Sequence, residues 1–252
     1  MNSKKLRLGI VLTIIGIIGI ASMLTMEITL PPEAEAILRD KFSPGQIKLL
    51  LLINPTMLLI VAVAVGTALY DKVNLRLPLL ERLTGISGES INPFEIIKYG
   101  VLAGLLSGVL LSLIGGVFTS ILPSEFQELG DNLQPTLAVR FLYGGFTEEI
   151  LMRFGLMTFI VWVASKIAGR TKPIVYWSGI LLAAVIFAFG HFPVVFQSVE
   201  SPSSMLLSYI LLGNSVGGII FGWVYWKKGL ESAFVAHIFA HVVMVSAGAM
   251  LS

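Results

Sequence analysis

The sequence contains no cysteine, and only 13% of its 252 residues are charged. Without cysteine the protein has no disulfides, no thiol nucleophile and no metal site with cysteine ligands. The charged fraction is about half of the roughly 25% found in soluble domains, which argues against a soluble protein. The net charge is +2 and the basic residues are scattered along the chain. The sequence therefore has no basic patch of the kind that indicates a nucleic-acid partner.

Hydrophobic residues, in contrast, make up 56% of the chain and occur in long runs. A helix needs roughly 20 apolar residues to cross a bilayer. The runs are too long for strands and lack the alternation of a membrane β-barrel. We therefore predict an all-α polytopic transmembrane bundle with about seven (7–8) spans. The expected spans are 8–26, 47–70, 99–121, 137–165, 173–199, 204–226 and 230–251.

The segments between the spans alternate in charge along the chain. Lys4, Lys5 and Arg7 precede the first span, segment 27–46 is mainly acidic, and segment 71–98 is basic again. Because basic residues are retained on the cytoplasmic side, this alternation predicts a cytoplasmic N-terminus and an external C-terminus. Segment 71–98 mixes basic and apolar residues with Pro and Gly, which favours a cytoplasmic interfacial helix followed by a turn.

The chain has three histidines, and all of them lie in predicted spans: His191, His237 and His241. An ionisable residue inside a membrane costs about 2.5–3.5 kcal/mol on insertion scales and usually marks a functional site. These polar residues lie downstream of residue 136. We therefore predict a catalytic helical core over 137–252, and accessory N-terminal helices with the interfacial segment over 1–136.

The stretch "GGFTEEILMRFG" places two glutamates and an arginine in the fourth span. Glu149 and Arg153 are four residues apart with the acidic residue first, which is the favourable order for a helical ion pair. Glu148 points about 100° away and has no local cation, so it is the candidate general base. Gly144 and Gly145 stand four residues before the glutamates and leave room for close approach of a substrate or another helix.

His237 and His241 are also four residues apart, with about 6 Å of helical rise between them. This spacing suits two ligands of one metal or two donors to one oxyanion. Residue 238 is Ile, so the HExxH signature is absent and a carboxylate would have to come from the fourth span. His191 lies in "FAFGHFP". We expect the fifth span to continue through Pro193 to about Val199, which brings His191 deeper into the membrane.

Three short motifs of the sequence resemble those of a known protein family. "EEILMR" matches an EExxxR motif, "FAFGH" an FxxxH motif and "HIFAH" an HxxxN-type motif, all in the order typical of the CAAX-processing and bacteriocin-processing (CPBP) intramembrane proteases. The resemblance covers roughly residues 137–251. It implies a type II CAAX prenyl endopeptidase-like enzyme, with a peptide or membrane-protein segment as substrate. The compact chain with short loops is more similar to the prokaryotic relatives, which implies a prokaryotic plasma membrane.

The resemblance also implies roles for the residues. Glu148 and His191 would hold and deprotonate the attacking water, while His237 and residue 241 would stabilise the oxyanion. The family usually has Asn where this chain has His241, and a third histidine also fits a metal site. Whether a divalent cation such as Zn²⁺ binds His191, His237, His241 and Glu148 stays open at this point.

Two other functions are compatible with the sequence. A non-catalytic bacteriocin-immunity or partner-binding membrane protein could keep the polar cluster as a binding pocket. A proton-coupled transporter could use Glu and His side chains as a relay. The three intact motifs favour the protease, because a binding protein needs no combination of base, water-holding residue and oxyanion donor.

Overall fold

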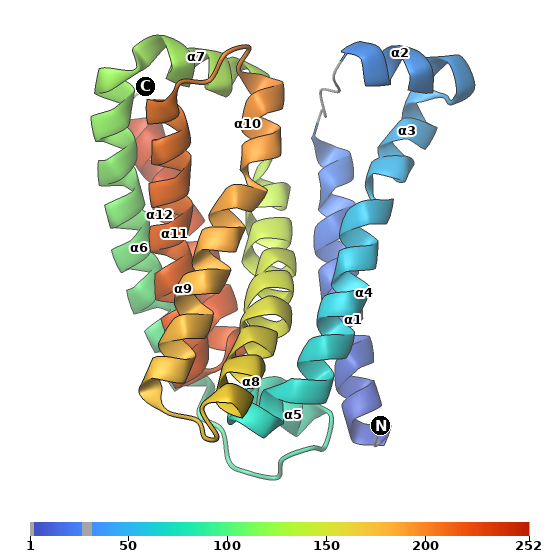
Figure 1. The fold of residues 1–252 in the computed structure, drawn as a ribbon, viewed down its shortest axis with the longest axis vertical. Helices are drawn as coiled ribbons and strands as arrows, with labels where there is room; N and C mark the ends of the chain where they lie inside the picture. Colours follow the sequence, from blue (N-terminus) through green and yellow to red (C-terminus); the bar gives the residue numbers. More distant parts are fainter. Residues whose placement is uncertain (1–2, 27–31, 252) are drawn as a thin grey trace.

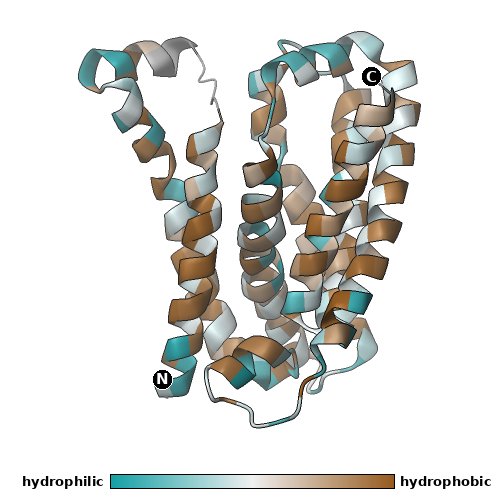
Figure 2. Cartoon of the chain, turned by 180° about the vertical axis from the view of Figure 1, so that it is seen from behind, coloured by the Kyte–Doolittle hydropathy of each residue, from teal (hydrophilic) through white to brown (hydrophobic). Residues whose placement is uncertain are grey.

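The computed structural model describes residues 3–26 and 32–251, and every regular element within them is a helix. Seven helical segments of this part of the chain are long and apolar enough to cross a membrane. Figure 2 shows hydrophobic residues along these helices and hydrophilic residues at both ends of the bundle. The prediction of an all-α polytopic bundle is confirmed. The described residues leave out 1–2, 27–31 and 252. The outer ends of the two predicted regions and part of acidic segment 27–46 therefore lie outside them.

The seven segments agree with the predicted spans to within a few residues at each end. They are Ser3–Thr25, Pro44–Val73, Pro93–Ile121, Val139–Ile167, Pro173–Ser198, Ser204–Lys228 and Leu230–Met250. In the order of Figure 1, the elements are α1 (Ser3–Ser22), η1 (Met23–Thr25), α2 (Pro32–Lys41), α3 (Pro44–Leu51), α4 (Ile53–Leu69), η2 (Tyr70–Val73), α5 (Pro78–Leu83), α6 (Pro93–Ile121), α7 (Pro123–Asn132), η3 (Val139–Glu148), η4 (Ile150–Met157), α8 (Thr158–Ile167), α9 (Pro173–Gly190), α10 (Phe192–Ser198), α11 (Ser204–Lys228) and α12 (Leu230–Leu251).

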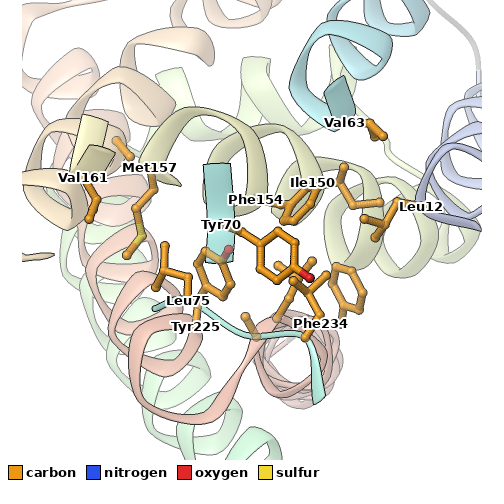
Figure 3. Packing of buried hydrophobic residues seen from close by; sticks show 14 of the residues in the cluster. Leu12, Val63, Tyr70, Leu75, Ile150, Phe154, Met157, Val161, Tyr225 and Phe234 are labelled. Atoms are coloured by element: carbon orange, nitrogen blue, oxygen red, sulfur yellow. The ribbon is translucent and has the colours of Figure 1, made fainter. Parts of the chain in front are cut away.

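The fourth span, formed by η3, η4 and α8, lies between the N-terminal helices and the rest of the bundle. On one side it packs against α1 and α4, and on the other against α9, α11 and α12. Figure 3 shows the core around it, where Phe154, Ile150 and Met157 meet Tyr70 and Tyr225. This central position puts the two glutamates in the interior, away from lipid.

The fourth span is wound more widely than an ordinary α-helix. Residues 139–157 form π-helix almost throughout, in which each N–H bonds the carbonyl five residues earlier. At its end, both the backbone N–H and the Oγ1 of Thr158 donate to the Arg153 carbonyl. The expected span is therefore present, and its winding differs from that of a regular α-helix. π-Helical turns are rare and often occur at functional sites.

The fifth span is interrupted at His191. Helix α9 ends at Gly190, His191 lies at the junction, and α10 begins at Phe192. Pro193 lacks an N–H and its ring clashes with the preceding turn of a regular helix, so the helix breaks just before it. The chain does continue in helical form to Ser198, as expected, but as two helices with His191 at the break.

Helix α6 packs closely along α12. Three glycines of α6, Gly100, Gly104 and Gly108, contact Val235, Phe239 and Val243 of α12 and the backbone carbonyls beside them. A methyl group at any of these glycines would overlap atoms of α12, so the absence of a side chain permits this approach. The contact fixes the helix that carries His237 and His241.

The two described ends of the chain lie at opposite ends of the bundle (Figure 1). Segment 71–98 crosses the end near the N-terminus and contains the short helix α5, followed by a turn with Gly85 in a left-handed conformation. Arg76 joins this segment together, because its Nε and Nη2 lie 3.0 Å from Glu81 and Glu89. The hydrogen bonds that Arg76 donates to these carboxylates, to Glu89 first, raise the pKa of Arg76. The expected helix and turn are present, and their cytoplasmic location stays a prediction.

Candidate active site

A cavity of about 480 Å³ lies inside the bundle, between the fourth span and helices α6, α7, α9, α11 and α12. Four residues singled out in the sequence line it: Glu148, His191, His237 and His241. They come from three separate spans. The side chain of Glu148 remains 19% exposed to the cavity, so one carboxylate is accessible to a small molecule bound there. The structure thus brings the base candidate and all three histidines to one space.

Glu149 and Arg153 lie behind the cavity wall rather than in it. The Nε of Arg153 is 3.2 Å from Oε2 of Glu149, and both side chains are almost completely buried. The guanidinium also lies over the rings of Phe187 and Phe221, at 5.0 and 5.6 Å from their centroids. The ion pair expected from the i,i+4 spacing is present. The ion pair and the two phenylalanine rings beside it support the wall of the cavity.

His237 connects this buried pair to the cavity. Its Nδ1 is 2.8 Å from Oε1 of Glu149, and its Nε2 is 3.8 Å from Oε2 of Glu148. A carboxylate paired with arginine accepts hydrogen bonds, so Nδ1 of His237 carries the proton and donates it. Nε2 of the neutral ring then has a lone pair directed toward Glu148. The ring is stacked between Phe221 and His241, with centroids 4.6 and 5.0 Å away.

The backbone orients His191 in the same way. Its Nδ1 lies 2.9 Å from the carbonyl of Phe187, one turn earlier in α9. A carbonyl can only accept, so Nδ1 carries the proton and Nε2 has the lone pair. The ring also lies edge-on to Phe187, with centroids 4.6 Å apart. His191 is therefore prepared to accept a hydrogen bond from water through Nε2.

His241 is the least constrained of the three rings. Its buried Nδ1 has no hydrogen-bond partner within the described residues. Its Nε2 faces the bare α-carbon of Gly144, because a methyl group built there would lie 3.0 Å from this nitrogen and 3.5 Å from Nε2 of His237. Either tautomer of His241 is open to it, so its Nε2 can carry a proton and donate into the cavity.

Four other described residues with polar side-chain groups line the cavity and were not among the predicted site residues: Arg140, Tyr143, Tyr209 and Asn214. Arg140 donates from Nε to the carbonyl of Pro135 at 3.2 Å, and it forms no ion pair with the described residues. Asn214 donates from Nδ2 to the carbonyl of Ile210 at 2.9 Å. The rule that marks intramembrane ionisable residues as functional would have selected Arg140, since it lies within the predicted fourth span.

Among the described residues, no three His, Asp or Glu side chains are arranged to hold a metal ion. In His191 and His237 the ring nitrogen that could bind a cation is Nε2, because Nδ1 is hydrogen-bonded, whereas either nitrogen of His241 could serve. Metal-binding histidines commonly donate their second N–H in this way. The chemistry of the donors fits a cation, but their arrangement does not form a complete site. The expected metal ligands His191, His237, His241 and Glu148 therefore remain a prediction.

Comparison with models of protein families finds one that matches residues 131–243, described as Type II CAAX prenyl endopeptidase Rce1-like. This segment includes the whole of η3 and η4 and all three histidines. Over this segment, which is somewhat less than half of the chain, the sequence is similar to the CAAX protease family. With seven apolar helices among the described residues, the chain is an integral membrane protein that resembles a protease family over this segment. No curated protein and no solved structure matches the chain. The division at residue 136 stays a prediction.

Proposed function

We propose that this protein is an intramembrane endopeptidase in which Glu148 and His191 activate a water molecule that attacks a peptide bond. One observation carries the proposal: Glu148 and His191 line the same cavity, and the Phe187 carbonyl leaves the lone pair of His191 Nε2 free. A carboxylate and an imidazole lone pair can accept the two hydrogens of one water. Such an arrangement directs the oxygen lone pair toward a carbonyl carbon.

The chemical steps follow from these groups. Glu148 takes one proton from the water as its oxygen forms a bond to the carbonyl carbon. The resulting tetrahedral oxyanion collapses, the C–N bond breaks, and the leaving amine takes a proton. That proton comes from Glu148 directly or through His237, whose Nε2 lies 3.8 Å from the Glu148 carboxylate. The products are one carboxylic acid and one amine, so no other reactant is needed.

The two histidines of α12 differ in how they could stabilise the oxyanion. His241 can donate from Nε2 as a neutral ring, since no described residue bonds its Nδ1. His237 donates Nδ1–H to Glu149, so it can donate from Nε2 only after taking up a second proton. We therefore assign the oxyanion donor role to His241 first, with His237 joining once Glu148 has passed it a proton. Histidine at position 241 can in this way replace the asparagine usual in the family.

The substrate is proposed to be a peptide or membrane-protein segment with a carboxylate near the scissile bond, as at a CAAX-type C-terminus. Arg140 and Glu148 line the same cavity, and Arg140 has no ion-pair partner among the described residues. Eight residues separate them, which is about 12 Å at α-helical rise and somewhat less in wider winding. Three extended residues span roughly 10–11 Å. This spacing supports release of a short C-terminal fragment whose carboxylate binds Arg140.

The test compares purified wild type with Glu148→Gln and His191→Ala in liposomes, using a library of quenched fluorescent peptides. General acid–base groups contribute about 10²–10⁴ in rate, so each variant is expected to lose at least 100-fold in kcat. Glu95→Gln is the matched control, because Glu95 lies on the exposed first turn of α6, away from the cavity. Metal content, measured on the same samples, distinguishes a glutamate protease from a zinc-dependent one.

Circular dichroism and thermal unfolding establish that the variants are folded. If both folded variants cleave as fast as wild type, the assigned roles are wrong. If wild type cleaves nothing in the library and both variants retain the protein's function in cells, the immunity or partner-binding alternative replaces the protease.

A further inference from the structure

A second cavity, of about 490 Å³, lies on the other side of η3 and α12 from the first. It is lined by α1, α5, α6, η3 and α12, and all the described side chains that line it, except one, are apolar. Ile18 of α1 and Ile97 of α6 lie on its wall and are each 52% exposed. Since exposed faces of spanning helices meet lipid, this cavity opens toward the acyl chains between α1 and α6.

The exception is Glu231, the second residue of α12. Its side chain lines the cavity although the residue is only 6% exposed. Oε1 accepts a hydrogen bond from the backbone N–H of Leu80 at 2.9 Å. Oε2 is buried and has no hydrogen-bond partner among the described residues. A buried carboxylate oxygen without a donor is costly, so the cavity lacks one polar group that would complete it.

The position of Glu231 along the membrane normal indicates how a ligand would lie. Lys227 and Lys228 end α11 just before it, and α5 packs beside it at the same end of the bundle (Figure 1). Ile18 is far along α1 from this end, whereas Glu231 is at the start of α12. The cavity therefore has its one polar group at the membrane surface and apolar walls deeper in the bilayer, which is the orientation of a lipid.

We propose that this cavity binds a membrane amphiphile that has a primary ammonium group and an apolar chain. The ammonium would donate to Oε2 of Glu231 and balance its charge, while the chain would pack against Ile18, Ile97 and Phe146. An anionic head group is excluded by repulsion from the carboxylate, and a quaternary amine has no N–H to donate. An alcohol can donate but leaves the carboxylate charge unbalanced.

The bound amphiphile would contact both elements that carry the catalytic residues. Phe146 of η3 and Phe234 of α12 pack edge-on in the wall of this cavity, with centroids 5.2 Å apart. Phe146 lies two residues before Glu148, and Phe234 lies three residues before His237. The ligand would thus hold together the two helices that meet at the active site, from the side opposite to the peptide.

The test measures binding of tetradecylamine and of tetradecanol, which has the same chain length, to the full-length protein in phosphatidylcholine nanodiscs by native mass spectrometry. We expect wild type to retain the amine at least tenfold more strongly than the alcohol. Glu231→Gln should remove this preference, and Ile97→Trp, which fills the cavity, should remove binding of both probes. Glu89→Gln is the control, because this carboxylate lies at the same end and is 73% exposed.

Equal retention of amine and alcohol by wild type would overturn the proposal, and so would undiminished amine binding in folded Glu231→Gln. If Glu231→Gln does not fold, unchanged amine binding by Ile97→Trp overturns it in the same way. A parallel series with phosphatidylethanolamine in the nanodiscs identifies the source of the ammonium. Glu231-dependent retention of that lipid assigns a lipid head group, and retention of tetradecylamine alone assigns a single-chain amine.

Discussion

His237 illustrates how a single residue in this protein serves both stability and chemistry. One ring nitrogen bonds buried Glu149, which is paired with Arg153, and the other faces Glu148 at the cavity. Removing one member of a buried ion pair commonly costs 3–5 kcal/mol, because the remaining charge has no partner. The pair therefore maintains the orientation of His237, which in turn determines which of its nitrogens can react.

The adjacent glycines Gly144 and Gly145 give the first prediction. A methyl group at Gly144 would project between the glycine and the Nε2 atoms of His241 and His237. Gly144→Ala should therefore lower kcat at least 100-fold with little change in melting temperature, since the methyl enters a cavity. Gly145→Ala places its methyl against Ile238 and should instead destabilise the fold. Peptide cleavage and thermal unfolding of the two variants measure these effects. An unchanged kcat in Gly144→Ala would mean that the cavity is not the active site.

Arg140 gives a second prediction at this scale. If its guanidinium binds a substrate carboxylate, Arg140→Gln should raise KM at least tenfold for peptides with a free C-terminus, with a smaller effect on kcat. The same peptides with an amidated C-terminus should be cleaved equally by wild type and variant, because they lack the group that Arg140 binds. Steady-state kinetics with the matched pair of peptides measures this. Equal losses on both peptides would assign Arg140 a structural role only.

At the scale of elements, α7 covers one side of the catalytic cavity. Its Phe126 and Leu129 line the cavity. Glu125 and Glu128 accept hydrogen bonds from the backbone N–H groups of Ser203 and Glu200 at 2.9 and 2.8 Å. Asn132 donates to the carbonyl of Ser198 at 2.9 Å. These contacts attach α7 to the segment that joins α10 to α11, so access to the cavity from this side requires α7 to move.

Cross-linking tests this inference, and because the sequence has no native cysteine, only the introduced cysteines can react. Glu128→Cys with Glu200→Cys, joined by a short cleavable linker, should reduce peptide turnover at least tenfold, and cleavage of the linker should restore it. A linked pair at residues 95 and 98, on the first turns of α6, is the control and should cleave normally. Full turnover with α7 linked would show that substrate enters by another path.

At the scale of the whole molecule, the fold brings basic residues of several loops to one end. Lys5 bonds Asp71 at 2.7 Å, and α5 lies beside the first turn of α12, so the N-terminus, segment 71–98 and the α11–α12 junction share that end. Basic residues are retained in the cytoplasm during insertion, so this end is expected to be cytoplasmic.

Single-cysteine labelling checks this orientation. Ser201→Cys, in the loop before α11, should react with a membrane-impermeant maleimide in intact cells. Ser87→Cys, in the turn after α5, should react only after the membrane is opened. The reverse result would mean that the catalytic cavity, which α7 covers at the end opposite α5, opens to the cytoplasm.

Several features were determined by the sequence alone because they depend on neighbouring residues. A span is a property of about 20 consecutive residues, so all seven were located from hydrophobic runs. The Glu149–Arg153 pair and the shared face of His237 and His241 follow from i,i+4 spacing. Residue type and spacing also carried the resemblance to the CAAX proteases, which the family model matches over residues 131–243, since these motifs are local.

Only the tertiary structure decided how these local features meet. The bond between His237 and Glu149 joins residues 88 apart in the chain, and it determines which nitrogen of His237 faces the cavity. The π-helical winding of the fourth span, the break at His191 and the exposure of Arg140 to the cavity also depend on packing between helices. Glu231 had no motif to mark it, and its unpartnered oxygen is visible only when α1, α5, α6 and α12 enclose it. Hydrophobic runs select which segments enter the membrane, but within it the partners of each polar side chain depend on the helices around it.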